Sequence, residues 1–241
     1  MKSLILAGGK GTRFSEETTT KPKPMIEILE KPMLLYIIEH YKSFGIDDFV
    51  ILGGTKIEYI IDYFSNKFKN IDKLNNLYEI ENKVKVQILD TGEETATGGR
   101  VKKAIELLNL DRFLLTYGDG ISNVNIKKLV DFHKENKAIG TLTAVRPPAR
   151  FGSLEILNEK VKHFGEKNQA NEGWINGGFF VFEKTISEYI SDYSTPLELE
   201  PLENLAKESQ LFAFKHTGFW QPVDTIREKE ILEKAILNDK Y

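Results

Sequence analysis

Apolar positions in the first half of the chain fall into two alternating kinds of segment. Short continuous runs at residues 3–7, 48–52 and 112–117 are rich in Val, Ile, Leu and Phe, which is typical of strands buried on both faces of a parallel sheet. Residues 83–89 alternate between polar and apolar, as a half-exposed strand does. Between these runs, apolar residues recur at helical spacing and predict helices over residues 32–43, 57–68, 98–108 and 126–136.

The second half of the chain has a more mixed pattern. It predicts strands at residues 140–145, 153–157, 177–182 and 210–215, and helices at residues 197–208 and 224–238. The lysines between residues 67 and 73 are interpreted as a solvated face. The β-α-β-α order predicts an α/β fold, with a Rossmann-like, mostly parallel or mixed twisted sheet and helices on both faces.

Composition narrows the class of protein. The chain has 241 residues, of which 41% are hydrophobic, so it can bury one sizeable core. A formal net charge of −3 argues against a general nucleic-acid binder. The absence of cysteine excludes disulfides and thiolate metal sites. No apolar run is long enough for a signal peptide or a membrane span, so we expect a soluble, cytoplasmic protein with no membrane partner.

The first strand runs directly into the glycine-rich segment LAGGKGTR. Phe14 stands where a Rossmann fingerprint requires glycine, and no Walker A sequence is present. A different phosphate loop remains, in which glycines let backbone N–H groups approach an anion, Thr12 offers a hydroxyl and Arg13 a bidentate fork. Lys21 and Lys23 follow in the proline-stiffened segment TKPKPM. The alternative is a tight turn with a surface arginine.

Two aspartates are candidates for a magnesium site. Asp119 follows the apolar run 112–117 between two glycines, so we expect it at the carboxyl edge of the sheet, where ligands bind in open α/β folds. Asp224 lies in WQPVDT. The alternatives are a turn aspartate at position 119 and a helix N-cap at position 224.

The segment TGEETATGGR, residues 91–100, combines small residues with a predicted helix start. Such a loop can bring backbone groups against a base edge, and the helix N-terminus suits an anion. A plain helix-start loop is the alternative. The four histidines have no metal-ligand spacing, and we assign them no chemistry.

Taken together, these motifs resemble the signature of the sugar-phosphate nucleotidyltransferases. LAGGKGTR and KPKPM carry the superfamily likeness, whereas DTGEETATGGR, TYGDG, RPPARFG, INGGFF and GFWQPVDT look like its glucose-1-phosphate cytidylyltransferase branch. The resemblance implies a glycosyltransferase-A-like fold in one domain, residues 1–241, with a nucleotide-binding half at about 1–125 and an acceptor-binding half at about 126–241. It also implies an enzyme that uses CTP and Mg²⁺ to transfer a cytidylyl group to glucose 1-phosphate. Another phosphorylated acceptor, or a regulator that binds nucleotide without turnover, remains open.

The resemblance assigns roles to individual residues. It implies that Arg13, Lys23 and Asp119 are catalytic and that Asp119 and Asp224 share the metal. The nucleotide-binding residues it implies are Leu6, Ala7, Gly8, Gly9, Gly11, Thr12, Thr97, Gly98, Gly99, Arg100 and Gly118. The acceptor-binding residues it implies are Phe151, Gly152, Glu166, Lys167, Asn176 and Gly177. Separately, the position of Trp220 near Asp224 makes it a candidate for the floor of the sugar pocket.

The chain departs from its relatives in two places. Asn168 follows Glu166 and Lys167 where the usual pattern is Glu-Lys-Pro, which puts the identity of the acceptor in doubt. The stretch 67–85 and the C-terminal tail look shorter than in typical members. Because relatives associate partly through such segments, association into a homo-oligomer is left open.

Overall fold

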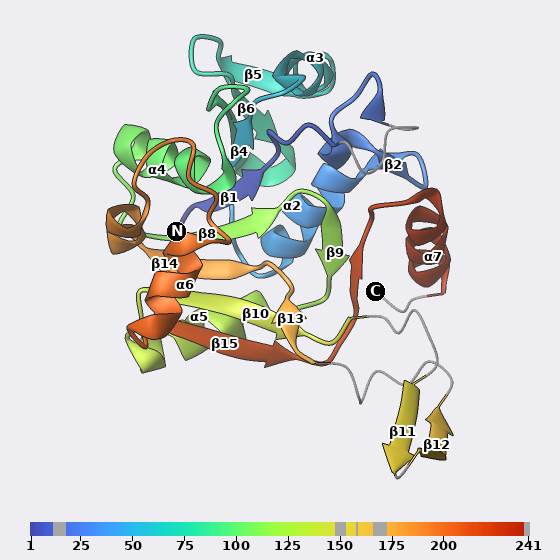
Figure 1. The fold of residues 1–241 in the computed structure, drawn as a ribbon. Helices are drawn as coiled ribbons and strands as arrows, with labels where there is room; N and C mark the ends of the chain where they lie inside the picture. The colour runs from blue at the N-terminus through green and yellow to red at the C-terminus, as the bar shows by residue number, and fades with distance from the viewer. Residues whose placement is uncertain (12–17, 148–152, 158, 166–172, 239–241) are drawn as a thin grey trace.

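The computed structural model describes residues 1–11, 18–147, 153–157, 159–165 and 173–238. Within these residues the core is one ten-stranded mixed sheet, with the strand order β13-β10-β14-β8-β1-β4-β7-β6-β5 and with β15 paired to β10 (Figure 1). Its strands are β1 (Ser3–Leu6), β4 (Asp48–Gly53), β5 (Lys69–Asp72), β6 (Leu77–Ile80), β7 (Val84–Asp90), β8 (Arg112–Tyr117), β10 (Gly140–Val145), β13 (Ile175–Asn176), β14 (Phe180–Glu183) and β15 (Leu211–His216).

The centre of the sheet is parallel, because β8, β1, β4 and β7 run side by side in that order. Side chains along each central strand alternate between two buried clusters. Ile5 packs on one face of the sheet, whereas Leu4 and Leu6 pack on the other. Burial on both faces explains why these strands appear in the sequence as continuous apolar runs.

The described helices divide between the two faces. Helices α2 (Met33–Ser43), α3 (Ile57–Lys67), α5 (Ile126–Asn136) and α7 (Ile226–Leu237) contribute buried residues to one cluster. Helices α4 (Thr97–Leu108) and α6 (Glu200–Lys207) contribute to the other, together with the 3₁₀ helix η5 (Lys184–Tyr189). The predicted α/β fold with helices on both faces is therefore confirmed. None of the described helices has the length and apolar content needed to cross a lipid bilayer.

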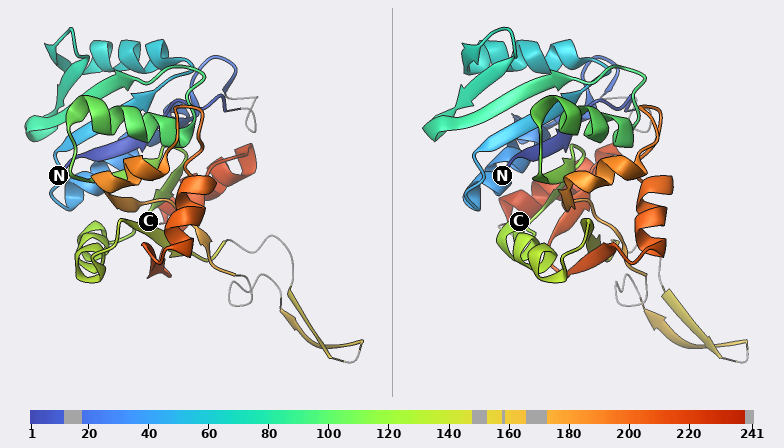
Figure 2. Two further views of the ribbon diagram at one scale, coloured as in Figure 1. Left: turned by 60° about the vertical axis from the view of Figure 1, so that its left-hand side comes forward. Right: turned by 90° about the vertical axis from the view of Figure 1, so that its left-hand side faces the viewer.

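Smaller elements build the rim of the sheet. They are the 3₁₀ helix η2 (Lys23–Met25), the hairpin of β2 (Glu27–Ile28) and β3 (Lys31–Pro32), the 3₁₀ helix η3 (Glu81–Lys83), and the pair of β9 (Gly120–Ser122) and β16 (Trp220–Pro222). A further hairpin of β11 (Ser153–Leu157) and β12 (Lys160–Gly165) stands apart from the main sheet in each view (Figures 1 and 2).

Most predicted elements are present, and the helix over residues 126–136 and the strands 112–117, 140–145 and 153–157 have the predicted bounds. The predicted strand 177–182 is confirmed only from residue 180, where β14 begins. Gly178 has φ +77° and Phe179 φ +48°, so the backbone turns there and separates β14 from the short strand β13 that precedes the turn. The lysines between residues 67 and 73 are exposed as expected, but residues 69–72 also form the edge strand β5, which the sequence reading missed.

Both C-terminal helices begin later than predicted. Helix α6 begins at Glu200 with Pro201 in its first turn, and helix α7 begins after Thr225. The Thr225 side chain caps α7 by accepting a hydrogen bond from the Glu228 N–H at 3.2 Å. The alternative interpretation of Asp224 as the helix N-cap is therefore wrong, because the next residue performs that role.

Candidate active site

A pocket of about 490 Å³ opens at the edge of the sheet where β1, β4, β7 and β8 end. Its walls come from six parts of the chain: the segment after β1, η2, the start of α4, the end of β8, and the segments around residues 196–198 and around residue 224. Among its lining residues are Leu6, Ala7, Gly8, Gly9, Gly11, Lys23, Thr97, Arg100, Tyr117, Gly118, Asp119, Glu198 and Asp224. Most of the predicted nucleotide and metal residues therefore face one cavity.

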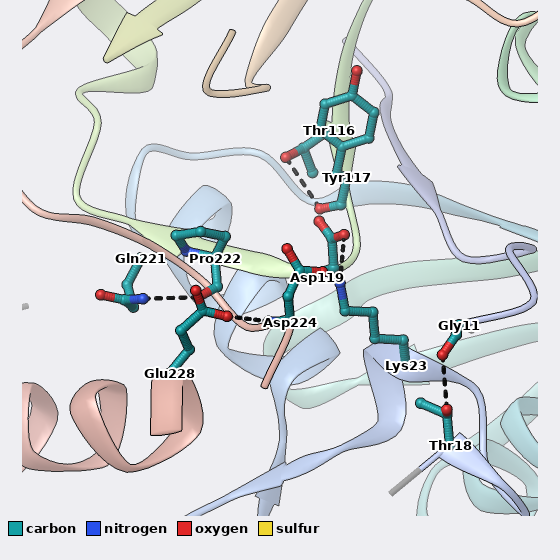
Figure 3. A network of polar contacts seen from close by, with 10 residues as sticks. All are labelled: Gly11, Thr18, Lys23, Thr116, Tyr117, Asp119, Gln221, Pro222, Asp224 and Glu228. Atoms are coloured by element: carbon teal, nitrogen blue, oxygen red, sulfur yellow. Dashed lines mark hydrogen bonds and ion pairs between the residues drawn. The ribbon is translucent and has the colours of Figure 1, made fainter. Parts of the chain in front are cut away.

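Lys23, Asp119 and Asp224 meet at one end of this pocket (Figure 3). The Lys23 ammonium donates hydrogen bonds to Asp119 Oδ2 at 2.8 Å and to Asp224 Oδ1 at 2.6 Å. Burial alone would lower the pKa of Lys23, but the two aspartates outweigh burial and hold that pKa above its ordinary value. The lysine therefore stays charged.

The pairing of β9 with β16 explains how residues so distant in sequence come together. Pro222 lies opposite Gly120, and the Val223 N–H donates to the Asp119 carbonyl at 2.9 Å. Asp224 follows directly and is fixed through its own N–H, which donates to the Glu228 carboxylate at 2.8 Å (Figure 3). The fold therefore brings Asp119 and Asp224 together through backbone pairing.

The two carboxylates suit a divalent metal ion. One oxygen of each carboxylate contacts the same atom, Lys23 Nζ. These two oxygens are therefore separated by no more than the sum of their distances to Nζ. Mg²⁺ in nucleotide sites takes one or two carboxylates and completes its shell with phosphate oxygens and water. Across the described residues no group of three or more His, Cys, Asp or Glu side chains gathers as a metal-ligand cluster. Asp119 and Asp224 supply the two carboxylates that such a magnesium site takes.

The glycine segment after β1 borders the same pocket. Gly11 has φ +65°, a conformation that favours glycine, and the Thr18 hydroxyl donates to the Gly11 carbonyl at 2.9 Å. Gly11 and Thr18 therefore lie side by side (Figure 3). The predicted residues Thr12 and Arg13 lie between them, outside the residues that the structure describes.

The start of α4 forms another part of the pocket. The Thr97 hydroxyl donates to Glu198 Oε2 at 2.6 Å and accepts from the Leu197 N–H at 2.8 Å. Gly98 and Gly99 face the backbone of residues 193–197, and a Cβ at Gly99 would lie 2.1 Å from the Tyr193 carbonyl oxygen. These two glycines therefore allow close packing of α4 on that segment, and the structure does not bring them to the pocket lining.

A second, smaller cavity of about 40 Å³ adjoins the pocket and shares Tyr117 and Asp119 with it. Its other lining residues include Asn176, Gly177 and Trp220. The Trp220 indole N–H donates to the Gly177 carbonyl at 2.9 Å. Three predicted acceptor-side residues therefore lie together beside the carboxylates. The other predicted acceptor residues, Phe151, Gly152, Glu166 and Lys167, lie outside the described residues.

Tyr117 and Glu198 are pocket residues that the sequence analysis did not select. The Tyr117 hydroxyl donates to Glu198 Oε1 at 2.8 Å and lies 3.3 Å from Asn176 Nδ2, which donates to it. Burial raises the pKa of Tyr117 far above its ordinary value, and Glu198 raises it further. Tyr117 lies in the motif TYGDG that carried part of the resemblance, whereas no signal around Glu198 distinguishes it from other surface acids.

Comparison with known proteins gives one consistent result. The family model described as nucleotidyl transferase matches residues 2–228. The chain is 45% identical to the glucose-1-phosphate cytidylyltransferase of Salmonella typhimurium, over 97% of this chain and 95% of that protein. It is 38% identical to the probable glucose-1-phosphate cytidylyltransferase of Bacillus subtilis, over 97% of this chain and 94% of that protein.

A solved structure supports the fold. The HddC protein of Yersinia pseudotuberculosis, complexed with GMP-PN, matches with a TM-score of 0.74 over 98% of this chain and 99% of that chain, at 24% identity. The fold and the sequence likeness agree with the pocket geometry. The chain belongs to the nucleotidyl transferase family, as its glycine-rich opening segment and its later motifs predicted.

Proposed function

We propose that this protein transfers a cytidylyl group from CTP to glucose 1-phosphate, forming CDP-glucose and pyrophosphate. The observation that carries the proposal is the convergence of Lys23, Asp119 and Asp224 at one end of a pocket lined by the glycine segment. The choice of CTP and glucose 1-phosphate is supported by the 45% and 38% identical relatives, which bear the name of that activity.

The two cavities suggest a division of the substrates. CTP would occupy the larger pocket, with its phosphates at the glycine segment and its base toward Thr97. The acceptor sugar would extend to the smaller cavity, where Asn176 and Trp220 lie. Asp119 lines both cavities, so the reacting phosphates would meet beside it. The sheet runs unbroken between the predicted halves, and we propose that residues 1–241 act as one domain.

The chemistry needs no covalent enzyme intermediate. An acceptor phosphate oxygen would attack the α-phosphorus in line while pyrophosphate leaves, and catalysis would come from positioning and charge neutralisation. Asp119 and Asp224 would hold Mg²⁺, which supplies neutralisation of phosphate charge. Lys23 would donate its hydrogen bonds to phosphate oxygens. By resemblance, Arg13 would bind the departing phosphates and Lys167 the acceptor phosphate.

Turnover across a substrate matrix tests the proposal. Four nucleoside triphosphates are combined with glucose 1-phosphate, other sugar 1-phosphates and non-sugar phosphates, and pyrophosphate release is measured with Mg²⁺ present. We expect CTP with glucose 1-phosphate to give the highest kcat/KM. Asp119→Asn is expected to lower kcat by about a hundredfold or more while retaining the fold.

Two results would contradict the proposal. Turnover with CTP and only a different acceptor would reject glucose 1-phosphate and retain cytidylyl transfer. Binding of CTP and Mg²⁺ without pyrophosphate release from any acceptor would indicate a nucleotide-binding regulator.

A further inference from the structure

The Arg100 side chain connects three neighbouring strand ends at the pocket. Arg100 lies in the first turns of α4 and is only 3% exposed. Its guanidinium donates to the carbonyls of Gly8 at 2.9 Å, Gly53 at 2.7 Å, Gly92 at 2.8 Å and Glu93 at 3.2 Å, and to the Thr91 hydroxyl at 2.6 Å. These acceptors follow or end β1, β4 and β7, which are adjacent in the sheet. One side chain therefore fixes three segments relative to one another.

Two glycines leave the space that the guanidinium occupies. A Cβ at Gly8 would lie 2.2 Å from Arg100 Cζ, and a Cβ at Gly54 would lie 2.4 Å from Arg100 Nη1. The end of an arginine side chain usually moves aside at little cost, but five acceptors hold this one in place. The glycine at position 8 therefore accommodates Arg100, which is a role beyond the approach to an anion that the sequence predicted for the glycines of this segment.

The contact with Gly8 also fixes the direction of an N–H donor. In a trans peptide the C=O and N–H bonds point in opposite directions. Because the Gly8 carbonyl accepts from Arg100, the N–H of Gly9 points away from the guanidinium. Gly9 lines the pocket, and a Cβ placed on it would meet nothing within 4 Å, so its surroundings are open. An N–H held in this way suits an anion.

Arg100 also brings a positive charge to the pocket. In the part of the chain that the structure describes, its five hydrogen-bond acceptors are all neutral, and the Asp90 carboxylate acts on it without forming an ion-pair contact. A guanidinium remains protonated even when buried. Lys23, in contrast, is neutralised by two aspartates. The buried positive charge of Arg100 is therefore available to an anion that enters the pocket it lines.

We propose that Arg100 is a positioning residue for the condensed phosphate chain of the nucleotide. It holds the Gly8 carbonyl so that the Gly9 N–H is presented to phosphate, and it adds a positive charge whose hydrogen bonds all go to neutral groups. This inference rests on the proposed assignment of the larger pocket to CTP. In it, Arg100 acts on the phosphates by positioning the glycine segment, and it does not contact the base.

Binding of inorganic tripolyphosphate, measured by titration calorimetry, tests the inference. Arg100→Met should weaken binding by about tenfold or more, whereas Arg100→Lys, which keeps the charge, should lose less. Lys102→Met is the matched control, because Lys102 is on the same helix and also donates to backbone carbonyls, those of Ile190 and Ser191. That control should bind within about twofold of wild type.

Gly54→Ala is a second, independent variant. Gly54 is not among the residues that line the pocket, but its new Cβ would displace the guanidinium. We expect the same loss of tripolyphosphate binding as in Arg100→Met, and no further loss when Gly54→Ala is added to Arg100→Ala. Wild-type affinity in folded Arg100→Met, or equal losses in the Met and Lys variants, would overturn the inference.

The same measurements separate this inference from the proposed function. Tripolyphosphate binding that depends on Arg100, in a wild-type protein that does not turn over CTP, would reject only the proposed function. Normal turnover of CTP with an unchanged KM for CTP in Arg100→Met would reject only the role of Arg100.

Discussion

Lys23→Met removes the cation that contacts both Asp119 and Asp224. In wild type the ammonium contacts one oxygen of each carboxylate, at 2.8 and 2.6 Å. Each contact has a Coulomb energy of about 4 kcal/mol or more at an effective dielectric near 20. Methionine has a similar length and no charge, so the variant leaves the two carboxylates without the Lys23 charge between them.

The net effect is smaller than the Coulomb energies. Burying the ammonium, which is 12% exposed, costs several kcal/mol in the folded state, and solvent screens Asp119, which is 43% exposed. We therefore expect Lys23→Met to lower the free energy of unfolding by about 1–3 kcal/mol without divalent cations. For a chain of this size, each kcal/mol lost from the free energy of unfolding lowers Tm by about 2–4 °C.

The assay is urea unfolding with EDTA and then with increasing Mg²⁺. Because the pKa of Lys23 is raised in the folded state, its contribution is fully present below the unfolded value of about 10.4 and is lost only as the pH rises through the folded pKa. Measurements at pH 7–8 therefore report the whole effect. Mg²⁺ should stabilise Lys23→Met more than wild type, because lysine no longer competes for the two carboxylates.

Lys184→Met serves as the control, since it breaks an exposed ion pair with Asp111. It should change stability less than Lys23→Met, and its response to Mg²⁺ should equal that of wild type. The reasoning is refuted if Lys23→Met is as stable as wild type in EDTA, or if Mg²⁺ stabilises both proteins equally.

Three further predictions follow from contacts elsewhere in the structure. Burial lowers the pKa of His133 although the Glu183 carboxylate raises it, so stability should fall as the pH drops below about 6.5. Unfolding between pH 5 and 7.5 should show a weaker pH dependence in His133→Gln, and equal slopes would contradict this assignment. Lys56 donates to the carbonyls of Thr18 and Thr19. Lys56→Met should lower kcat/KM for CTP by about tenfold, and an unchanged value in the folded variant would exclude a positioning role. Trp220→Phe removes the hydrogen bond to the Gly177 carbonyl. It should raise KM for the sugar phosphate by about three- to tenfold and leave KM for CTP unchanged. An equal rise in both KM values would count against an acceptor role for Trp220.

The elements that could be predicted are those whose burial leaves a strong pattern. Strand β8 is apolar throughout because both its faces are covered, and α5 shows clear helical spacing with an Asn125 cap. The hairpin of β5 and β6 was missed because it lies at the sheet edge, where all of its residues except the buried Tyr78 are exposed or half-buried, and its strands have four residues each. Short edge strands carry little hydrophobic signal.

The residues of the candidate site also differ in how well the sequence predicts them. The glycine segment, Lys23 and Asp119 could be selected because each lies within a local motif at the end of a strand. The pairing of Asp119 with Asp224 depends on two three-residue strands, β9 and β16, whose contact no local pattern encodes. The residues themselves suggested the wrong role for Asp224, that of a helix cap, and only family resemblance placed it beside Asp119.

The distribution of charge explains why Lys23 and Arg100 must act differently. Two of the three Lys23 N–H donors are engaged by carboxylates, so Lys23 can turn these two donors to phosphate when another cation satisfies Asp119 and Asp224. Arg100 is hydrogen-bonded to neutral groups and forms no ion-pair contact with Asp90, the carboxylate that acts on it among the described residues, so it can attract an anion without exchanging partners. A triphosphate that enters without a divalent cation would therefore be attracted by Arg100 but repelled by Asp119 and Asp224. A triphosphate that enters with one relieves that repulsion and releases Lys23, so nucleotide and metal should each increase the affinity for the other.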